Sequence, residues 1–205
     1  MSAAGWLLAS YLLGAIPTSH LVSRSVAGID LREHGSRNLG ATNLYRVLGW
    51  GYAVPVALFD AAKGAVPVLL FAPRISDSVR VALVCGIVAI LGHVFSIFVR
   101  FRGGKGVATA AGVMLALTPL ALLTSLGLWL VLVLVTGYVS LASVVSAAWF
   151  PVAVLLLAPG VRRELFWTDL LVALAIIWLH RANIGRLLKG TENRFGRHRT
   201  PAARG

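Results

Sequence analysis

Long apolar runs, separated by short polar and basic segments, dominate the chain. A helix that crosses the hydrocarbon core of a bilayer needs about 20 mostly apolar residues. Runs of that length are 3–23, 50–71, 79–99, 138–158 and 165–185. The pattern therefore predicts an all-α polytopic membrane protein with a single transmembrane helical domain over residues 1–189. Residues 190–205 are polar and basic, and we expect them to form a cytoplasmic tail.

The run 107–136 is too long to be one span, because as a single helix it would measure about 45 Å against a hydrocarbon core of about 30 Å. The residue before a proline avoids the helical region, so Thr118-Pro119 marks a break. We expect a short helix over 107–117 and a second over 119–136. The prediction becomes about seven transmembrane helices, one of them short.

Composition supports a membrane protein. The chain is 58% hydrophobic and 13% charged, whereas soluble domains are roughly 45–50% apolar and about 25% charged. One cysteine, Cys85, cannot build a disulfide framework or a cysteine metal cluster. No basic residue precedes the first apolar run, so we expect a retained helix rather than a cleaved signal peptide.

Basic residues outnumber acidic ones, 19 to 7, and they lie at the ends of apolar runs. That placement favours a membrane surface or an anionic substrate over nucleic acid. The side that holds more Lys and Arg faces the cytoplasm. If the N-terminus is outside, the outer side holds only Arg74, Arg80, Arg162 and Arg163. The expected topology has the N-terminus outside and the C-terminus in the cytoplasm.

The first polar segment with chemical potential reads HGSRNLGATNLYR, residues 34–46. Ser36 and Asn38 are candidate caps for a helix that begins near residue 39 or 40, with its backbone N–H groups directed at the loop. Next on that helix come a hydroxyl, an amide and a guanidinium, which together suit a phosphate: Thr42, Asn43 and Arg46. The alternative is an ordinary interfacial helix with a snorkelling arginine.

The second segment reads LGHVFSIFVRFRGGKGVAT, residues 91–109. Its glycines directly precede a helix, where free amides and the positive dipole end would face an anion: Gly103, Gly104 and Gly106. Lys105 adds a point charge, although the segment does not match a Walker A loop. His93 is an ionisable group inside a span and hence a functional candidate. The alternatives are a positive-inside turn and a histidine bonding between helices.

The third segment reads HRANIGRLLKGTEN, residues 180–193. His180 and Asn183 share a helical face, Arg186 follows one turn later, and Glu192 is the acid of this region. Cations at a helix C-terminus are favoured by the dipole alone, but that does not explain His180, Asn183 or Glu192. Under the expected topology all three segments meet at the cytoplasmic edge.

The acidic residues and the lack of repeats bear on three alternative functions. Asp60 and Lys63 lie three residues apart inside a span, and we expect them to neutralise each other. A phosphotransferase with paired metal-binding aspartates is disfavoured, since the aspartates are scattered over different segments: Asp30, Asp60, Asp77 and Asp169. A transporter of organic phosphates would predict inverted repeats and a mid-membrane site, and neither is evident. A scaffolding protein would show no turnover.

At these residues the chain resembles the bacterial acyl-phosphate:glycerol-3-phosphate acyltransferase (PlsY) family. Its three motifs read roughly G-S-x-N-x-G-A-T-N-x-x-R, G-H-x-x-P-x-F-x-x-F-K-G-G-K-G-V-A-T and H-x-x-N-I-x-R-L-x-x-G-x-E. They correspond here to 35–46, 92–109 and 180–192, in the same order. Three residues depart from the motifs: Arg37 replaces glycine, Ser96 replaces proline and Arg102 replaces lysine. If that glycine has a positive φ, Arg37 strains the loop.

The resemblance implies an enzyme of the bacterial cytoplasmic (inner) membrane with its active site facing the cytoplasm. It would move a fatty acyl group from acyl phosphate to the 1-hydroxyl of sn-glycerol 3-phosphate, giving 1-acyl-sn-glycerol 3-phosphate (lysophosphatidate) and phosphate, the first step of phospholipid biosynthesis. No cofactor or metal is expected. The expected partners are the two substrates and membrane lipids, with no nucleic acid, and a monomer fits.

An acyl phosphate is already activated, so positioning and electrostatic stabilisation can supply most of the catalysis. The residues expected to be catalytic are Ser36, Arg46, Lys105, His180 and Asn183. Those expected to bind substrate are Asn38, Thr42, Asn43, His93, Gly103, Gly104, Gly106, Arg186 and Glu192. Either His180 or a substrate phosphate oxygen could accept the hydroxyl proton.

Overall fold

The computed structural model describes residues 1–158 and 162–195, with residues 162–164 as backbone only. This part of the chain contains helices and loops but no strand. The α-helices are α1 (Ala3–Ala15), α2 (Thr18–Ala27), α3 (Ala41–Leu48), α4 (Trp50–Val66), α5 (Val79–Val94), α6 (Val107–Leu117), α7 (Pro119–Thr136), α8 (Val139–Leu157), α9 (Arg162–Leu179) and α10 (Arg181–Leu188). Helix α4 continues through a π-turn, Pro67–Phe71, and a 3₁₀ turn, Ala72–Arg74, and a further 3₁₀ turn spans Ile97–Val99.

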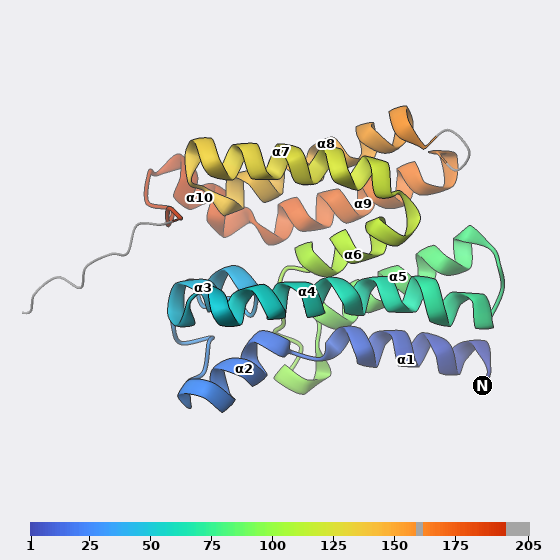
Figure 1. Cartoon of the computed structure of the whole chain (residues 1–205), viewed down its shortest axis with the longest axis horizontal. Coiled ribbons are helices and arrows are strands. Elements are labelled where there is room, and N and C mark those ends of the chain that lie inside the picture. Colours follow the sequence, from blue (N-terminus) through green and yellow to red (C-terminus); the bar gives the residue numbers. More distant parts are fainter. Residues whose placement is uncertain (159–161, 196–205) are drawn as a thin grey trace, which may run out of the picture.

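The helices form two layers (Figure 1). The first contains α1, α4, α5 and α6, and the second contains α7, α8 and α9. Glycines allow close packing in the first layer: a Cβ on Gly14 would lie 2.1 Å from the Ala89 carbonyl oxygen, and one on Gly64 would lie 2.1 Å from that of Thr109. Backbones in contact through small residues are typical of membrane helix packing.

The structure confirms an all-helical membrane protein. Among the described residues, four helices are long and apolar enough to cross a bilayer, and a fifth is obtained if the bent pair α9–α10 counts as one span. Helices α1 and α6 are apolar but shorter. The predicted break at Thr118-Pro119 is confirmed, since α6 ends at Leu117 and α7 begins at Pro119.

Two predicted spans are wrong as single helices. The span predicted over 3–23 ends at Ala15, because Pro17 interrupts the helical hydrogen bonding, and α2 begins at Thr18. The span predicted over 165–185 ends at Leu179 and bends by 56° into α10. The bend occurs at His180.

A buried ion pair supports the first break. Lys63 Nζ lies 2.7 Å from Asp60 Oδ1 and donates to the carbonyl oxygen of Ile16 over 2.8 Å. Thr18 Oγ1 donates to the same Asp60 oxygen over 3.1 Å. The predicted pairing of Asp60 with Lys63 is therefore confirmed, and the pair also bonds to polar groups on both sides of the α1–α2 break.

Candidate active site

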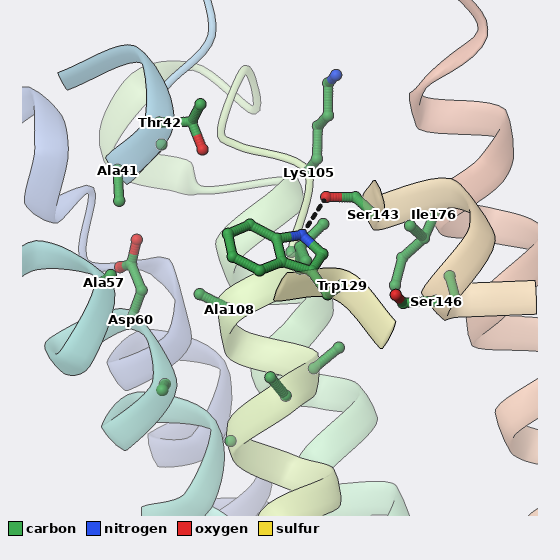
Figure 2. A pocket seen from close by; sticks show the side chains of 18 of the residues that line it. Ala41, Thr42, Ala57, Asp60, Lys105, Ala108, Trp129, Ser143, Ser146 and Ile176 are labelled. Carbon is green, nitrogen blue, oxygen red and sulfur yellow. Dashed lines mark hydrogen bonds between the residues drawn. The ribbon is translucent and has the colours of Figure 1, made fainter. Parts of the chain in front are cut away.

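A cavity of about 500 Å³ lies between the two layers. One end is bordered by α3, the start of α4 and Lys105. Away from this end the lining is mostly apolar and includes Met114, Leu122 and Phe150, with Ser146 and Asp169 as polar exceptions. Figure 2 shows Trp129 at the centre of the view, with Thr42 and Asp60 on one side and Ser143 and Ser146 on the other. The Trp129 indole donates to Ser143 Oγ over 3.2 Å. A cavity with this gradient suits an amphipathic ligand.

Beside the polar end, a cluster of charged and amide groups joins the two layers. Lys105, on the loop before α6, donates to Asn183 Oδ1 on α10. The Asn183 amide donates to Glu192 Oε1 over 2.8 Å, and Arg186 Nε donates to Glu192 Oε2 over 2.6 Å. Ser140 Oγ on α8 also donates to Glu192 over 3.1 Å. Predicted residues from the second and third segments are thus in direct contact.

Burial disfavours the charged forms of two basic side chains in this region. Burial lowers the pKa of Lys105 to about 8, with Glu192 acting in the opposite direction. Burial also lowers the pKa of Arg46 on α3, and Glu192 again opposes the shift. A bound anion would offset the desolvation of both side chains. The cluster therefore has the electrostatics of an anion site.

His180 lies at the bend between α9 and α10. Its Nδ1 is 2.8 Å from the Ile176 carbonyl oxygen. Because a carbonyl can only accept, Nδ1 carries the proton, and Nε2 of the neutral ring is left as an acceptor. The structure thus fixes the tautomer that a hydroxyl donor would require.

Asn43 organises the first segment from inside. It is buried, its Oδ1 accepts from the Ser36 amide over 2.7 Å, and its Nδ2 lies within 3.2 Å of three carbonyl oxygens: those of Leu31, His34 and Asn38. The predicted capping by side chains is wrong, since Gly40 occupies the N-cap of α3 and no side chain caps it. In this structure Asn43 therefore shapes the loop that carries Ser36 and Asn38. Asn38 and Thr42 line the cavity.

Asp30 fixes the start of the same loop. Its carboxylate accepts from Arg32 Nη2 over 2.6 Å and lies 3.4 Å from Arg24 Nη2. The hydrogen bond from Arg32 holds the pKa of Asp30 well below its usual range. The pairing of Asp30 with Arg32, two residues apart, was not anticipated from the sequence.

The glycines of the second segment have a packing role. The Gly103 amide donates to the Val94 carbonyl over 3.0 Å, and the Gly104 amide donates to the His93 carbonyl over 3.2 Å. The expectation that these two amides face an anion is therefore wrong. A Cβ on Gly103 would lie 1.9 Å from the His93 oxygen, so the loop can press against the end of α5 only without a side chain there. Gly106, with φ +75°, allows the turn into α6.

His93 lies on the cavity wall, with Nδ1 3.9 Å from Asp60 Oδ1. It is thus beside the buried ion pair as well as the candidate site. Ser140 and Ser143, from the stretch YVSLAS, were not singled out from the sequence, because serines on an apolar helix are compatible with simple packing. Their roles follow from Glu192 and Trp129, which are distant in sequence.

The departures from the family motifs have visible structural consequences. Arg37 has φ +61°, so a side chain occupies a left-handed position as anticipated. Ser96 Oγ donates to the Ala15 carbonyl at the end of α1. Arg102 is exposed.

The predicted tail is partly packed. The Phe195 amide donates to the Gly137 carbonyl over 2.7 Å, and its ring lies 4.7 Å from that of Tyr45 and 5.1 Å from that of Trp50. These aromatic rings border the polar end of the cavity. Residues 196–205 lie outside the described part of the chain, and a basic tail there stays a prediction.

Fold and site together define a helical membrane protein with an apolar cavity that leads to a cationic, amide-rich cluster. The chain belongs to the glycerol-3-phosphate acyltransferase family, whose model matches residues 4–190. The glycerol-3-phosphate acyltransferases of Desulforudis audaxviator and Trichlorobacter lovleyi are 47% and 45% identical to it, over 91% and 93% of this chain and 92% and 96% of theirs.

Two solved structures are similar over 95% of this chain. A crystal structure of PlsY (YgiH), an integral membrane glycerol 3-phosphate acyltransferase, in its glycerol 3-phosphate form has a TM-score of 0.87 at 38% identity, with 96% of that chain covered. The lysophosphatidic acid form has a TM-score of 0.83 at 36% identity, with 95% covered.

Proposed function

We propose that this protein transfers a fatty acyl group from acyl phosphate to the 1-hydroxyl of sn-glycerol 3-phosphate. The products would be 1-acyl-sn-glycerol 3-phosphate and inorganic phosphate. The observation that carries the proposal is the position of Lys105, which belongs both to the wall of the apolar cavity and to the polar cluster. An acyl chain in the cavity would place its phosphate end beside this cation. The family and the similar structures support acyl transfer to glycerol 3-phosphate.

In the proposed reaction the acceptor hydroxyl oxygen forms a bond to the acyl carbon, and the bond from that carbon to the phosphate oxygen breaks. Lys105 and Arg46 would stabilise the two phosphates, and Asn183 would hold the acceptor by hydrogen bonding. The hydroxyl proton would pass to His180 Nε2 or to an oxygen of the departing phosphate. Such a reaction depends mainly on preorganised charge and on orientation.

The remaining predicted residues fit supporting roles. Glu192 would hold Asn183 and Arg186 in place through its two oxygens. Asn43 would shape the loop that presents Ser36 and Asn38 to the substrates, and Thr42 on α3 would line the cavity beside them. Gly103 and Gly104 would bring Lys105 against α5, and His93 would border the acyl cavity beside Asp60.

Phosphate release by the purified protein tests the reaction. Palmitoyl phosphate with sn-glycerol 3-phosphate should release phosphate and yield the lysophospholipid. Omission of glycerol 3-phosphate, or replacement of the donor by palmitoyl-CoA, should abolish the product. Lysophospholipid formed from palmitoyl-CoA and glycerol 3-phosphate, without acyl phosphate, would contradict the proposed donor.

We also propose that the N-terminus is outside the cytoplasmic membrane of a bacterium and that the polar cluster faces the cytoplasm. The bias of basic residues supports this orientation. Fusion of a reporter that functions only in the cytoplasm should give signal at the C-terminus and none at the N-terminus. The reverse pattern would invert the topology.

A further inference from the structure

Two polar side chains on the cavity wall are unused by the proposed reaction. Asp169 on α9 is 1% exposed, and neither of its carboxyl oxygens has a hydrogen-bond partner in the described protein. Ser146 on α8 is 8% exposed, and its hydroxyl also has none. Both line the apolar cavity. Other polar groups of this wall are paired, since Ser125 Oγ donates to the Ala121 carbonyl and Ser143 accepts from Trp129.

Asp169 lies far from the polar cluster. Helix α9 runs from Arg162 to Leu179 and reaches the cluster at His180. The separation of Asp169 from His180 along the helix axis is about 16 Å at 1.5 Å per residue. Ser146 lies between these two levels, because α8 runs antiparallel to α9 from its start at Val139. An extended acyl chain would therefore pass Ser146 before reaching the carboxyl.

We propose that Asp169 is a polar stop that sets the acyl-chain length accepted by the cavity. This inference rests on the proposed function, in which the cavity holds the acyl chain of the donor. An alkyl chain that lies against an unpaired buried polar group gives it no hydrogen-bond partner, so that group's desolvation is uncompensated. A chain that ends before Asp169 avoids this cost, whereas a longer one incurs it.

The first test compares donors in the unaltered protein. Dodecanoyl phosphate should exceed octadecanoyl phosphate in kcat/KM by about tenfold or more, given the cost of burying an unsatisfied polar group. Equal values for the two donors would overturn the proposal without any variant.

Substitution at Asp169 provides the second test. Asp169→Leu should raise kcat/KM for octadecanoyl phosphate by about tenfold and leave dodecanoyl phosphate unchanged, because the shorter chain does not reach the site. Asp169→Asn should retain the original preference. Ser146→Ala should change the values for the two donors equally, because both chains pass Ser146 before the level of Asp169. The matched control is Asp77→Asn, which removes an exposed carboxylate outside the cavity. An equal change for both chain lengths in Asp169→Leu would indicate a structural role of Asp169 and would overturn the inference.

Binding separates this inference from the proposed reaction. Acyl phosphonates of both lengths carry a methylene in place of the bridging oxygen and cannot transfer their acyl group. In Asp169→Leu the octadecanoyl phosphonate should bind more tightly than in the unaltered protein, and the affinity of the dodecanoyl phosphonate should not change, even if no acyl transfer occurs. If the phosphonates bind in this pattern but the enzyme shows no turnover, the proposed acyl donor is wrong and the role of Asp169 still holds. If neither phosphonate binds the unaltered protein or Asp169→Leu, both proposals are overturned.

Discussion

The two layers of the molecule treat their buried acidic groups differently. In the first layer Asp60 is paired with Lys63 at 2.7 Å and accepts from Thr18. In the second layer Asp169 is equally buried but has no hydrogen-bond partner among the described residues. Both side chains line the same cavity from opposite walls. The fold satisfies Asp60 on the first wall, whereas Asp169 and Ser146 on the second present unpaired polar groups to whatever occupies the cavity.

The largest effect is expected when Asp60 loses its cation and becomes an unpaired buried acid, as Asp169 is. Lys63→Met leaves Asp60 buried without its cation, and breaking such a pair typically costs about 3–5 kcal/mol. Thermal unfolding in detergent should show a large fall in Tm. The control combines Asp60→Asn with Lys63→Met, which removes both charges and should recover much of the loss. A single variant as stable as the unaltered protein would show that the pair contributes little.

Next in size is the contact that joins the layers. Lys105→Ala removes a preorganised cation, and loss of one such donor typically costs about 2.7–4 kcal/mol of transition-state stabilisation. We expect kcat/KM for glycerol 3-phosphate to fall by about 10²–10³. Lys189→Ala removes an exposed lysine near the same end of the protein and is the matched control. If both variants keep the activity of the unaltered protein, Lys105 contributes only to membrane topology.

A smaller loss is expected at Glu192, the buried acid of the polar cluster. Glu192→Gln places an amide donor or a neutral oxygen against Arg186 Nε, which now donates to Glu192 over 2.6 Å. Hydrogen bonds to charged groups contribute about 1.5–3 kcal/mol, so we expect kcat/KM to fall by about 10–100-fold. Ser140→Ala removes one neutral bond to the same carboxylate and should cost less. If Ser140→Ala costs as much as Glu192→Gln, the charge of Glu192 is irrelevant.

The charge of Lys105 should make kcat/KM and the free energy of unfolding depend on pH in opposite directions. Its pKa is lowered from 10.5 to about 8, so the cation is lost from the free protein as pH rises through about 8. We expect kcat/KM to fall above that pH by up to about tenfold per pH unit. The unfolded chain binds more protons between the two pKa values, so the contribution of Lys105 to the free energy of unfolding rises with pH there. In Lys105→Ala both dependences should disappear, and an unchanged profile would assign them to another group.

The smallest effect is expected in the loop that Asn43 organises. Arg37 has φ +61°, and a left-handed conformation costs a residue with a side chain about 1–2 kcal/mol. Arg37→Gly removes this strain but gives the unfolded chain more freedom, which offsets about 0.4–1 kcal/mol. We expect a small rise in Tm and unchanged kinetics. A fall in Tm would mean that the Arg37 side chain stabilises the loop.

From the sequence alone we could predict the all-helical membrane class, the break at Thr118-Pro119, the pairing of Asp60 with Lys63 and the positions of the three polar segments. These follow from local features: run length, proline geometry and residues a few positions apart. The break at Pro17 was missed although the same proline rule applies to Ile16-Pro17, because the run 3–23 has the length of one span. The bend at His180 was missed because apolar composition does not reveal where a helix bends.

Tertiary structure decided which polar groups are still available to a ligand. Gly103, Gly104 and Asn43 match a phosphate site by type, yet contacts within the fold already occupy their hydrogen-bonding groups. Asp169 looked like one scattered aspartate, and only the packing of α8 and α9 placed it on the cavity wall. The physical reason is that hydrogen bonds and burial depend on partners far away in sequence, whereas helix formation depends mainly on neighbours.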